Sequence, residues 1–300
     1  MEKVYHIPVL LKESVDALDI KPSGIYVDVT FGGGGHSKEI LKRIENGKLI
    51  AFDQDKDVEE NLINDERFIF VGHNFKFLKN FLKYHHIEKV DGILADLGVS
   101  SHHLDSPERG FSFRFNGELD MRMNRNADFT AADLLNTYSK DRLQSIFKEY
   151  GEIHNPGKLA ETIESYRYKN ELKTIFQFTE AIKVCIPKHE PNKFLAQVFQ
   201  SMRMEVNKEV ESLKLLLNQT VETLNLGGRL VCISYHSLED RLVKNFMRSG
   251  KFEGDIEKDL YGNSLTPFEI ITKKAITPSE SELEQNSRSR SAKLRVAKKV

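Results

Sequence analysis

The 300-residue sequence contains no tryptophan and only two cysteines, Cys185 and Cys232. Because these cysteines are far apart and stand in apolar surroundings, we expect reduced thiols rather than a disulfide or a metal pair. The histidines show no metal-ligand spacing, so no metal is predicted. No apolar run approaches the roughly 20 residues that a membrane span requires, and the first residues lack the apolar core of a signal peptide. These absences predict a cytoplasmic protein.

An excess of positive charge is also missing, since 44 basic residues face 45 acidic ones and the net charge is -1. The chain as a whole therefore offers no polycationic surface to a nucleic acid. Residues 286–300 are a local exception, because they carry arginines and lysines and no acidic side chain. They form either a solvated tail or a contact with an RNA backbone. The alternation at 292–297 favours an edge strand over a disordered tail.

Apolar runs separated by amphipathic segments predict a doubly wound α/β sheet at the start of the chain. The predicted strands are 25–31, 49–53, 67–71 and 90–97, with helices at 37–44 and 75–84. The next convincing strand, 228–234, follows after about 130 residues, far more than a strand-to-helix connection requires. Two late apolar runs, 268–276 and 292–297, suggest an antiparallel edge pair.

Helical patterns fill the long gap between the strands. They lie at 130–138, 140–150, 158–168, 174–185 and 193–225. We therefore predict a helical domain inserted into the sheet domain. The expected division is 1–104 for the first part of the sheet domain, 105–212 for the inserted domain and 213–300 for the second part.

The segment 26–36 (YVDVTFGGGGH) runs from an apolar strand into four glycines and then into a helical pattern. Glycine allows close approach of the backbone to a ligand and makes positive φ angles available. Asp53 ends the next strand, at about the spacing at which an acid binds ribose hydroxyls in Rossmann-like proteins. The pattern predicts a site for a cofactor that contains a nucleoside, whereas the alternative is an ordinary turn between strand and helix.

The spacing within this turn favours one cofactor over another. A dinucleotide site favours the motif G-x-G-x-x-G, whereas here Asp28 is followed by Gly32 and Gly34. That rhythm is typical of methyltransferases that use S-adenosylmethionine (SAM). Thr30 stands where a first glycine is usual in that motif, so the match to the general pattern is imperfect.

Asp96 lies at the end of the predicted strand 90–97, in the segment ADLGVSS. Ligands of open α/β sheets bind at the carboxyl ends of the strands, so Asp96 is expected near the reactive group of the cofactor. An enzyme that methylates an exocyclic amine needs an acceptor for the amine hydrogens at this place. The alternative is that Asp96 only caps a turn or helix.

Aromatic and basic residues alternate in the segment 108–123 (ERGFSFRFNGELDMRM). Such a pattern can stack a splayed base and grip phosphates. For the phenylalanines, simple packing is the better interpretation. For Arg109 and Arg114, RNA binding is the better supported one, because the segment leaves the sheet at the edge that carries Asp96.

Several motifs in one order carry a resemblance to a known family. They are HIPVLLKESVDAL, VDVTFGGGGHS, DLGVSS, RGFSF with LDMRM, YGE, VNKEV, and ISYHSLEDRLVK with SRSAKLRVA, between His6 and Ala297. The chain resembles the small-subunit ribosomal RNA cytosine-N4 methyltransferases, known as RsmH or MraW. The resemblance implies a Rossmann-like SAM-dependent methyltransferase sheet with an inserted all-helical domain. It also implies methylation of N4 of a cytidine in the decoding region of 16S ribosomal RNA, with the RNA expected within the small ribosomal subunit.

The resemblance also implies which residues contact SAM. These are Gly34, Gly35, His36, Asp53, Phe75 and Asp96. Asp53 is expected to accept the ribose hydroxyls and Phe75 to lie against the adenine, while His36 is otherwise a helix-start residue. A further contact falls on His103, where the family usually has glutamine.

The strand 228–234 leads into a segment, YHSLED, that is expected at the same sheet edge. Tyr235 and His236 are candidates for holding the target cytosine, although His236 can equally be a structural hydrogen-bonding residue. Ser237 is predicted to cap the following helix, with Glu239 and Asp240 in its first turn.

Two other functions remain open from the sequence. A nicotinamide-dependent oxidoreductase would share the sheet and Asp53, but the glycine spacing fits it poorly. A non-catalytic RNA-binding or ribosome-assembly protein would explain the arginines without a need for Asp96.

Overall fold

The computed structural model describes residues 8–254, 256–262 and 265–300. Contacts divide the chain into two compact units, which we call the sheet unit (Met1–Gly98 with Val210–Val300) and the helical unit (Val99–Glu209). The limits predicted from the sequence are residues 105 and 212. His6, the first residue of the motifs that carry the family resemblance, lies outside the described residues.

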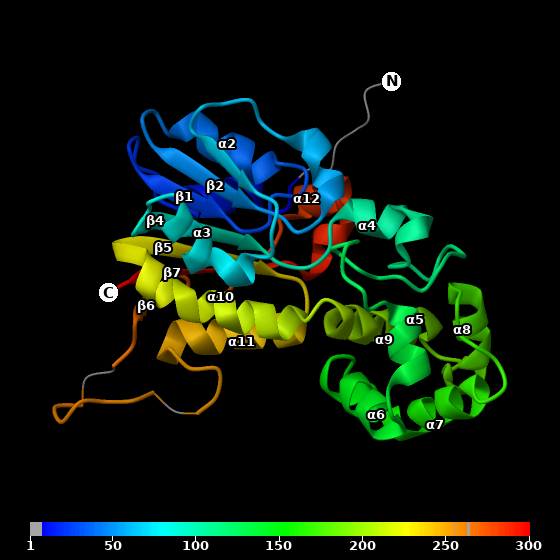
Figure 1. Cartoon of the computed structure of the whole chain (residues 1–300). Helices are drawn as coiled ribbons and strands as arrows, with labels where there is room; N and C mark the ends of the chain where they lie inside the picture. Colours follow the sequence, from blue (N-terminus) through cyan, green and yellow to red (C-terminus); the bar gives the residue numbers. More distant parts are fainter. Residues whose placement is uncertain (1–7, 255, 263–264) are drawn as a thin grey trace. The chain divides into compact units, whose positions relative to one another are not determined.

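The sheet unit contains a seven-stranded sheet in the order β3-β2-β1-β4-β5-β7-β6 (Figure 1). The strands are β1 Ile25–Asp28, β2 Lys48–Phe52, β3 Phe68–Val71, β4 Val90–Asp96, β5 Leu224–Ser234, β6 Phe268–Ile270 and β7 Lys293–Lys299. Strands β1 to β5 pair in parallel, whereas β7 is antiparallel to both β5 and β6. The prediction of a Rossmann-like sheet that ends in an antiparallel pair is confirmed.

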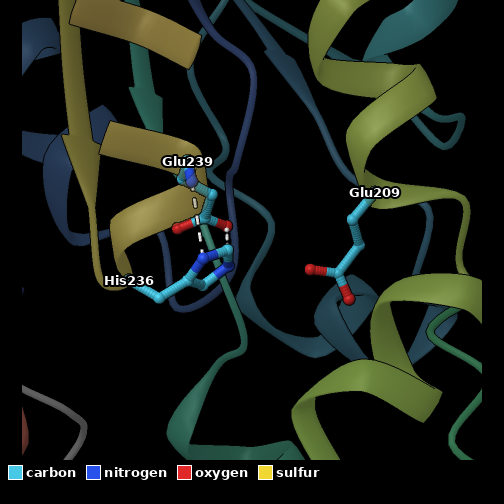
Figure 2. Close-up of side chains that lie close together, drawn as sticks. All are labelled: Glu209, His236 and Glu239. Carbon is cyan, nitrogen blue, oxygen red and sulfur yellow. Dashed lines mark hydrogen bonds and ion pairs between the residues drawn. The ribbon is translucent and has the colours of Figure 1, made fainter. Parts of the chain in front are cut away.

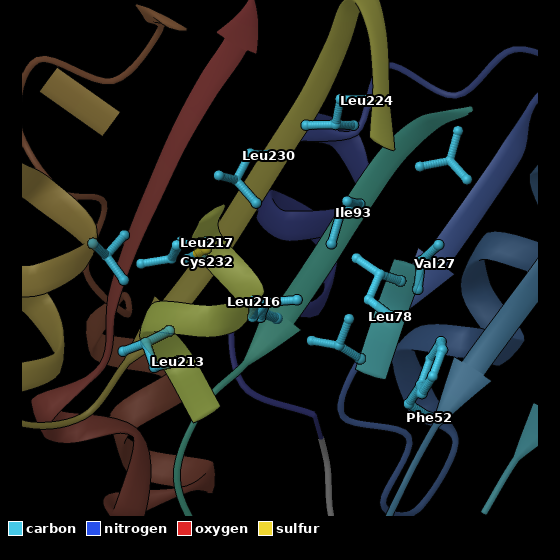
Figure 3. Close-up of a cluster of buried hydrophobic side chains, with 14 of the residues drawn as sticks. Val27, Phe52, Leu78, Ile93, Leu213, Leu216, Leu217, Leu224, Leu230 and Cys232 are labelled. Carbon is cyan, nitrogen blue, oxygen red and sulfur yellow. The ribbon is translucent and has the colours of Figure 1, made fainter. Parts of the chain in front are cut away.

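Helices cover both faces of the sheet because the strands are apolar on both sides. The helices of the sheet unit are α1 Leu11–Ala17, α2 Gly35–Arg43, α3 Leu78–Tyr84, α10 Glu209–Thr223, α11 Ser237–Ser249 and α12 Glu280–Gln285, with short 3₁₀ turns η1 Lys56–Asn61, η2 Phe75–Phe77 and η5 Ser287–Ser291. One buried cluster joins the sheet to α1 and α2. The other joins it to α3, α10 and α11, with Val27, Ile93 and Cys232 on the strands facing Leu78 and Leu216 (Figure 3).

Three of the predicted strands differ from the structure in length or in position within the sheet. The strand predicted at 25–31 ends at Asp28, although Val29 and Phe31 still donate backbone hydrogen bonds to Leu94 and Phe52. The predicted late strand 268–276 is short, and only an isolated bridge from Ile276 follows it. The C-terminal segment is a strand, as predicted, but β7 lies between β5 and β6 and is therefore not at the edge.

The helical unit is built on its own buried cluster. Its helices are α4 Ser101–Asp105, α5 Ala131–Thr137, α6 Lys140–Glu149, α7 Pro156–Arg167, α8 Ile175–Ala181 and α9 Pro191–Val206, with 3₁₀ turns η3 Pro107–Arg109 and η4 Lys183–Cys185. The prediction of one helix over 193–225 is wrong, because α9 ends at Val206 and α10 begins at Glu209. Lys208 adopts a left-handed backbone with φ 51°, and the Asn207 side-chain amide donates to the Arg203 carbonyl oxygen at 2.9 Å.

Two predicted absences can be compared with the structure. Both cysteines are free thiols, Cys232 buried in the sheet unit and Cys185 half-buried in the helical unit. Within the described ranges, no helix combines the length and the apolar character that crossing a membrane requires.

Candidate functional site

Asp28 organises the start of the glycine turn from inside the sheet unit. Its side chain is fully buried at the end of β1. One carboxylate oxygen accepts the backbone N–H of Thr30 at 3.1 Å, and the other accepts the hydroxyl of Ser37 in α2 at 2.7 Å. Burial raises the pKa of Asp28, while these hydrogen bonds oppose the rise. The carboxyl group thus ties the strand end to the helix that follows the turn.

The turn itself leaves no room for side chains at two positions. Gly34 has φ 73° and precedes α2 as its N-cap, and a Cβ atom there would lie 3.0 Å from the ring of Phe31. A Cβ atom on Gly35 would lie 2.0 Å from the Cγ atom of Pro8. Since the N-cap glycine has no side chain, it supplies no acceptor to the first N–H groups of α2. Such N–H groups favour negatively charged or polar ligand atoms.

Asp53 lies beside this turn, as the sequence predicts. It follows β2, and one of its carboxylate oxygens accepts the backbone N–H of Gly32 at 2.8 Å. The other accepts the N–H of Asp55 at 2.9 Å. Burial raises the pKa of Asp53 to about 6, with the charges of Asp55 and Asp28 adding to the rise and the two N–H groups opposing it. Each oxygen has lone pairs left for hydroxyl donors.

Phe75 begins the 3₁₀ turn η2, just after β3. Its ring is half-buried and packs against the cluster that includes α3 and α10. The neighbouring Asn74 donates its side-chain amide to Gln54 at 2.8 Å, so the segments that follow β3 and β2 lie side by side. Contact of Phe75 with an adenine remains a prediction.

Asp96 ends β4 and meets residues from two other elements. The hydroxyl of Tyr235, which follows β5, donates to its Oδ1 atom at 2.7 Å. The Nδ1 atom of the buried His36 in α2 lies 3.9 Å from its Oδ2 atom. Burial raises the pKa of Asp96 to about 6, and His36 and the Tyr235 hydroxyl oppose that rise. Three residues predicted separately, His36, Asp96 and Tyr235, therefore form one cluster.

His36 uses its other ring nitrogen within the fold. Its Nε2 atom lies 3.2 Å from the backbone oxygen of Val9. The imidazole is 5% exposed, so a contact with SAM through the ring would need this arrangement to change. The backbone of His36, in the first turn of α2, is the part suited to a ligand contact.

Thr30 belongs to this site, although the sequence marks it only as a departure from glycine. Its Oγ1 atom accepts the backbone N–H of Asp96 at 2.7 Å. The hydroxyl therefore joins the end of β1 to the end of β4, at the residue that carries the candidate catalytic carboxyl group. A glycine here could not make this hydrogen bond.

His236 is the N-cap of α11, which corrects the prediction of Ser237 for that position. His236 has extended backbone angles, and its Nδ1 atom accepts the N–H of Glu239 at 3.4 Å. Its Nε2 atom lies 3.1 Å from the Glu239 carboxylate (Figure 2). The same carboxylate accepts the backbone N–H of Tyr235 at 3.1 Å. Glu239 and Asp240 do lie in the first helical turn, as predicted.

Glu239 was therefore missed as a residue that holds the two candidate base-binding side chains. Its carboxylate reaches back to the start of α11 much as in a capping box, but the cap is a histidine and not the serine or threonine of that motif, so the sequence carried no standard signal for this role. Burial and the nearby Asp96 raise the pKa of Tyr235 far above its ordinary value. Tyr235 is thus a neutral hydrogen-bond donor at physiological pH. The observed cap supports a structural role for His236, and its contact with a base remains a prediction.

In the helical unit, the structure corrects the prediction of an RNA contact for Arg109. The side chain is 2% exposed, and its guanidinium donates to the backbone oxygens of Arg122 and Met123 at 3.0 and 3.1 Å. It also lies over the ring of Phe111, with 5.9 Å between Cζ and the ring centroid. A guanidinium committed to buried carbonyls cannot grip a phosphate. No local sequence pattern indicates this burial.

The other two candidates of the helical unit differ from each other. Arg114 is exposed and stays a predicted RNA contact. His103 is buried and stacks on Phe111 with a centroid separation of 4.7 Å, so at least one face of its ring is used in packing. Its contact with SAM remains a prediction.

Comparison of the sequence with known proteins identifies its family. Residues 3–300 match the model of the MraW methylase family. A protein of Bacteroides thetaiotaomicron named ribosomal RNA small subunit methyltransferase H is 58% identical over 299 residues, with 99% of this chain and 98% of that protein covered. A protein of the same name from Christiangramia forsetii is 56% identical over 297 residues, with the same shares covered. The predictions of a methyltransferase and of SAM as its cofactor are confirmed, and the chain belongs to the MraW methylase family.

Proposed function

We propose that this protein transfers the methyl group of SAM to N4 of a cytidine in the decoding region of 16S ribosomal RNA. Near full-length relatives with 58% and 56% identity are named as methyltransferases of small-subunit ribosomal RNA, which supports the RNA substrate. The choice of an exocyclic amine rests mainly on one observation. A half-buried carboxyl group, that of Asp96, ends β4 with a hydrogen-bonding phenol beside it.

The sheet unit offers residues suited to binding SAM. The packing of the turn requires glycine at 34 and 35, because a Cβ atom at either position would collide with Phe31 or Pro8. The backbone of this turn would face the cofactor. Asp53 would accept the two ribose hydroxyls, and Phe75 would lie against the adenine. When bound, SAM supplies a methyl group on a positively charged sulfur, which is a strong electrophile.

Asp96 would act on the amine of the target base. The lone pair of a cytosine amine is delocalised into the ring, so the amine is a poor nucleophile. A hydrogen bond from N4–H to the Asp96 carboxylate encourages the nitrogen to become pyramidal, and fixed positioning supplies much of the rate. Methylation of the neutral amine releases one proton. The Asp96 carboxylate would accept that proton and pass it to water, leaving a neutral methylated amine.

Tyr235 would position the base beside this carboxylate. Its hydroxyl already donates to Asp96 Oδ1, so the amine would bind to the remaining lone pairs of the carboxylate. Glu239 fixes the backbone of Tyr235, and the cap places His236 next to it. The base must leave its stack to reach such a site, which favours a single-stranded target. Exposed Arg114 is the remaining RNA contact from the sequence prediction.

The partner would be 16S ribosomal RNA within the small ribosomal subunit, which places the activity in the cytoplasm. A nicotinamide-dependent oxidoreductase has no support from a family of methylases. A non-catalytic assembly factor would bind the same RNA without transferring methyl groups, so catalysis is the property to measure.

The test uses small subunits from a bacterial strain that lacks the corresponding methyltransferase. The protein and tritium-labelled SAM should transfer label to 16S ribosomal RNA, and mass spectrometry of nuclease fragments should place the methyl group on N4 of one cytidine. Asp96→Ala should transfer no label while its thermal unfolding stays cooperative. RNA binding by the wild-type protein without label transfer would favour the assembly factor. Label at another atom would refute the N4 assignment.

A further inference from the structure

A row of cations lies on one face of α11 in the sheet unit. Arg241, Lys244 and Arg248 are spaced by three and four residues, which places them on the same side of a helix. All three side chains are exposed. We call these three residues the α11 basic stripe. The proposed mechanism uses none of them.

In the sheet unit, α11 packs beside β6 and β7 (Figure 1). A groove at this place adjoins the stripe. Its volume is about 100 Å³, and Lys244 and Arg248 line it from the helix. Exposed Lys273, just after β6, adds a fourth cation from the opposite side. Met247 and Val296 give the groove an apolar floor. Apolar surface between cations suits a ribose-phosphate chain, which presents sugar carbon atoms between its charges.

The cations of the stripe differ from their neighbours in β7. Arg295 donates to Asp240 at 2.6 and 3.1 Å, and Lys293 lies 3.4 Å from the same carboxylate. These two charges are therefore balanced within the protein. Over residues 8–254, 256–262 and 265–300, the stripe residues and Lys273 form no ion pair with another side chain. Four positive charges thus remain for an external anion.

The stripe begins near the edge that carries the catalytic candidates. α11 starts at Ser237, three residues after β5 ends, and β5 ends beside β4, where Ile233 pairs with Asp96. The helix then runs back along the sheet. At 1.5 Å per residue, Arg241 and Arg248 are separated by about 10.5 Å along its axis. This length corresponds to about three nucleotide steps of 3.4 Å in a helical strand.

We propose that the α11 basic stripe and its groove bind the phosphate backbone of the substrate RNA, on the nucleotides that lead away from the target base. This assignment rests on the proposed function, since it takes RNA as the substrate. Phosphate contacts fix register without reading sequence. The surface would therefore hold the RNA strand while the residues around Asp96 act on the base. The balanced pairs of β7 with Asp240 would keep the groove walls in place.

The experiment compares two variants of the full chain with equal changes in charge. The stripe variant is Arg241→Gln, Lys244→Gln and Arg248→Gln. The control variant is Lys38→Gln, Lys48→Gln and Lys83→Gln, which removes exposed lysines from other parts of the sheet unit. Binding to small subunits from the methyltransferase-deficient strain is measured over a range of salt concentrations, together with the kinetics of methyl transfer and calorimetric binding of SAM.

The stripe variant should bind the subunits at least about tenfold more weakly, and the plot of log affinity against log salt should be less steep by about 2. Its KM for subunits should rise while kcat and SAM binding stay unchanged. The control variant should match the wild type. Equal losses in both variants would overturn the proposal, as would a loss of affinity with an unchanged salt slope, which would indicate a protein partner.

Failure of the proposed function gives a different result. If the wild-type protein binds subunits through the stripe but transfers no methyl group to their RNA, the methyltransferase assignment falls and the RNA-binding surface stands. If the wild type methylates the RNA and the stripe variant shows the same KM and salt slope, the proposed RNA-binding role of the stripe is refuted. The methyltransferase assignment is then unaffected.

Discussion

The two half-buried carboxyl groups at the candidate site of the sheet unit and a buried carboxyl group of the helical unit are held in opposite ways. In the sheet unit, Asp53 and Asp96 accept hydrogen bonds from backbone N–H groups or a phenol, and burial raises the pKa of each to about 6. In the helical unit, burial also disfavours the charge of Glu205, but hydrogen bonds from Lys208, Arg142 and Tyr138 bring its pKa below the ordinary value.

This difference separates carboxyl groups that serve the fold from those that serve a site. The helical unit matches a buried charge with cations, so each group is satisfied before any ligand binds. In the sheet unit, Asp240 is matched with Arg295 and Lys293 in the same way, but Asp53 and Asp96 at the strand ends have no full counter-charge, and His36 is the nearest cation candidate to Asp96, at 3.9 Å. Carboxyl groups with a raised pKa and no full counter-charge tend to cluster where ligands bind. The comparison therefore predicts opposite effects of mutation in the two units.

Replacement of Asp96 should give the largest effect on catalysis. Asp96→Asn keeps the size of the side chain but removes the charge and the proton acceptor, so kcat for methyl transfer should fall about 10³-fold. The free energy of unfolding should not decrease, because an asparagine avoids the cost of a buried carboxylate. Single-turnover kinetics and urea unfolding measure the two quantities. A variant that loses stability and keeps its turnover would reverse the assignment.

Replacement of Glu205 should give the reverse pattern. Glu205→Ala leaves Arg142 and Lys208 without their shared carboxylate and removes the acceptor for the Tyr138 hydroxyl at 2.8 Å. The free energy of unfolding should fall by about 1–2 kcal/mol, because hydrogen bonds to the buried carboxylate are lost while Arg142 and Lys208 remain accessible to water. SAM binding in the sheet unit should stay unchanged by calorimetry. A large loss of SAM affinity would show that the division between structural and site carboxyl groups fails.

Replacement of Asp53 should affect cofactor binding alone. Hydrogen bonds to a charged group contribute about 1.5–3 kcal/mol, so Asp53→Ala should raise the dissociation constant of SAM about 10- to 100-fold. At saturating SAM, kcat should stay within a few-fold of the wild type, in contrast to Asp96→Asn. Calorimetry provides the dissociation constant. Unchanged affinity would remove Asp53 from the cofactor site.

The raised pKa of Asp96 predicts the pH dependence of catalysis. The carboxylate is the form that accepts the amine hydrogen, so kcat at saturating SAM should be half-maximal near pH 6 and about tenfold lower at pH 5 than at pH 7. Saturation with SAM isolates Asp96 from the titration of Asp53. Asp96→Asn should lose this dependence in its residual activity, and a wild-type profile that is flat between pH 5 and pH 7 would contradict the assignment.

The same groups predict how stability changes with pH, with opposite signs in the two units. The folded pKa of Asp96 is above its unfolded value of about 3.9, so its stabilising contribution is complete below about pH 4 and is lost as pH rises to about 6. The folded pKa of Glu205 is below its unfolded value of about 4.3, so its contribution is present above that pH and is lost as pH falls. Urea unfolding of Glu205→Ala should therefore lose less stability on acidification than the wild type.

The sequence was sufficient for the parallel strands because each contains a continuous apolar run, and for the positions of Asp53 and Asp96 because both end such runs. It was insufficient where long-range contacts decide. No glycine or proline stands near Lys208, whose backbone is left-handed, so the break between α9 and α10 had no local sequence signal. The burial of Arg109 depends on carbonyl oxygens 13 and 14 residues away. The cap of α11 went to His236 because an imidazole nitrogen can replace the usual serine oxygen.

Thr30 gives the smallest effect and the finest test of the strand-end cluster. Thr30→Val preserves the shape of the side chain but removes the hydroxyl that accepts the Asp96 backbone N–H. This partly buried N–H group then has no hydrogen-bond acceptor from residue 30. Stability should fall by about 1 kcal/mol, and kcat should fall about fivefold because Asp96 is no longer fixed against β1, a loss of about 1 kcal/mol. Thr30→Ser keeps the hydroxyl and should restore both quantities. If valine and serine variants show the same kcat and the same pH profile, Thr30 only fills space, and the alignment of Asp96 comes from Tyr235 and the sheet.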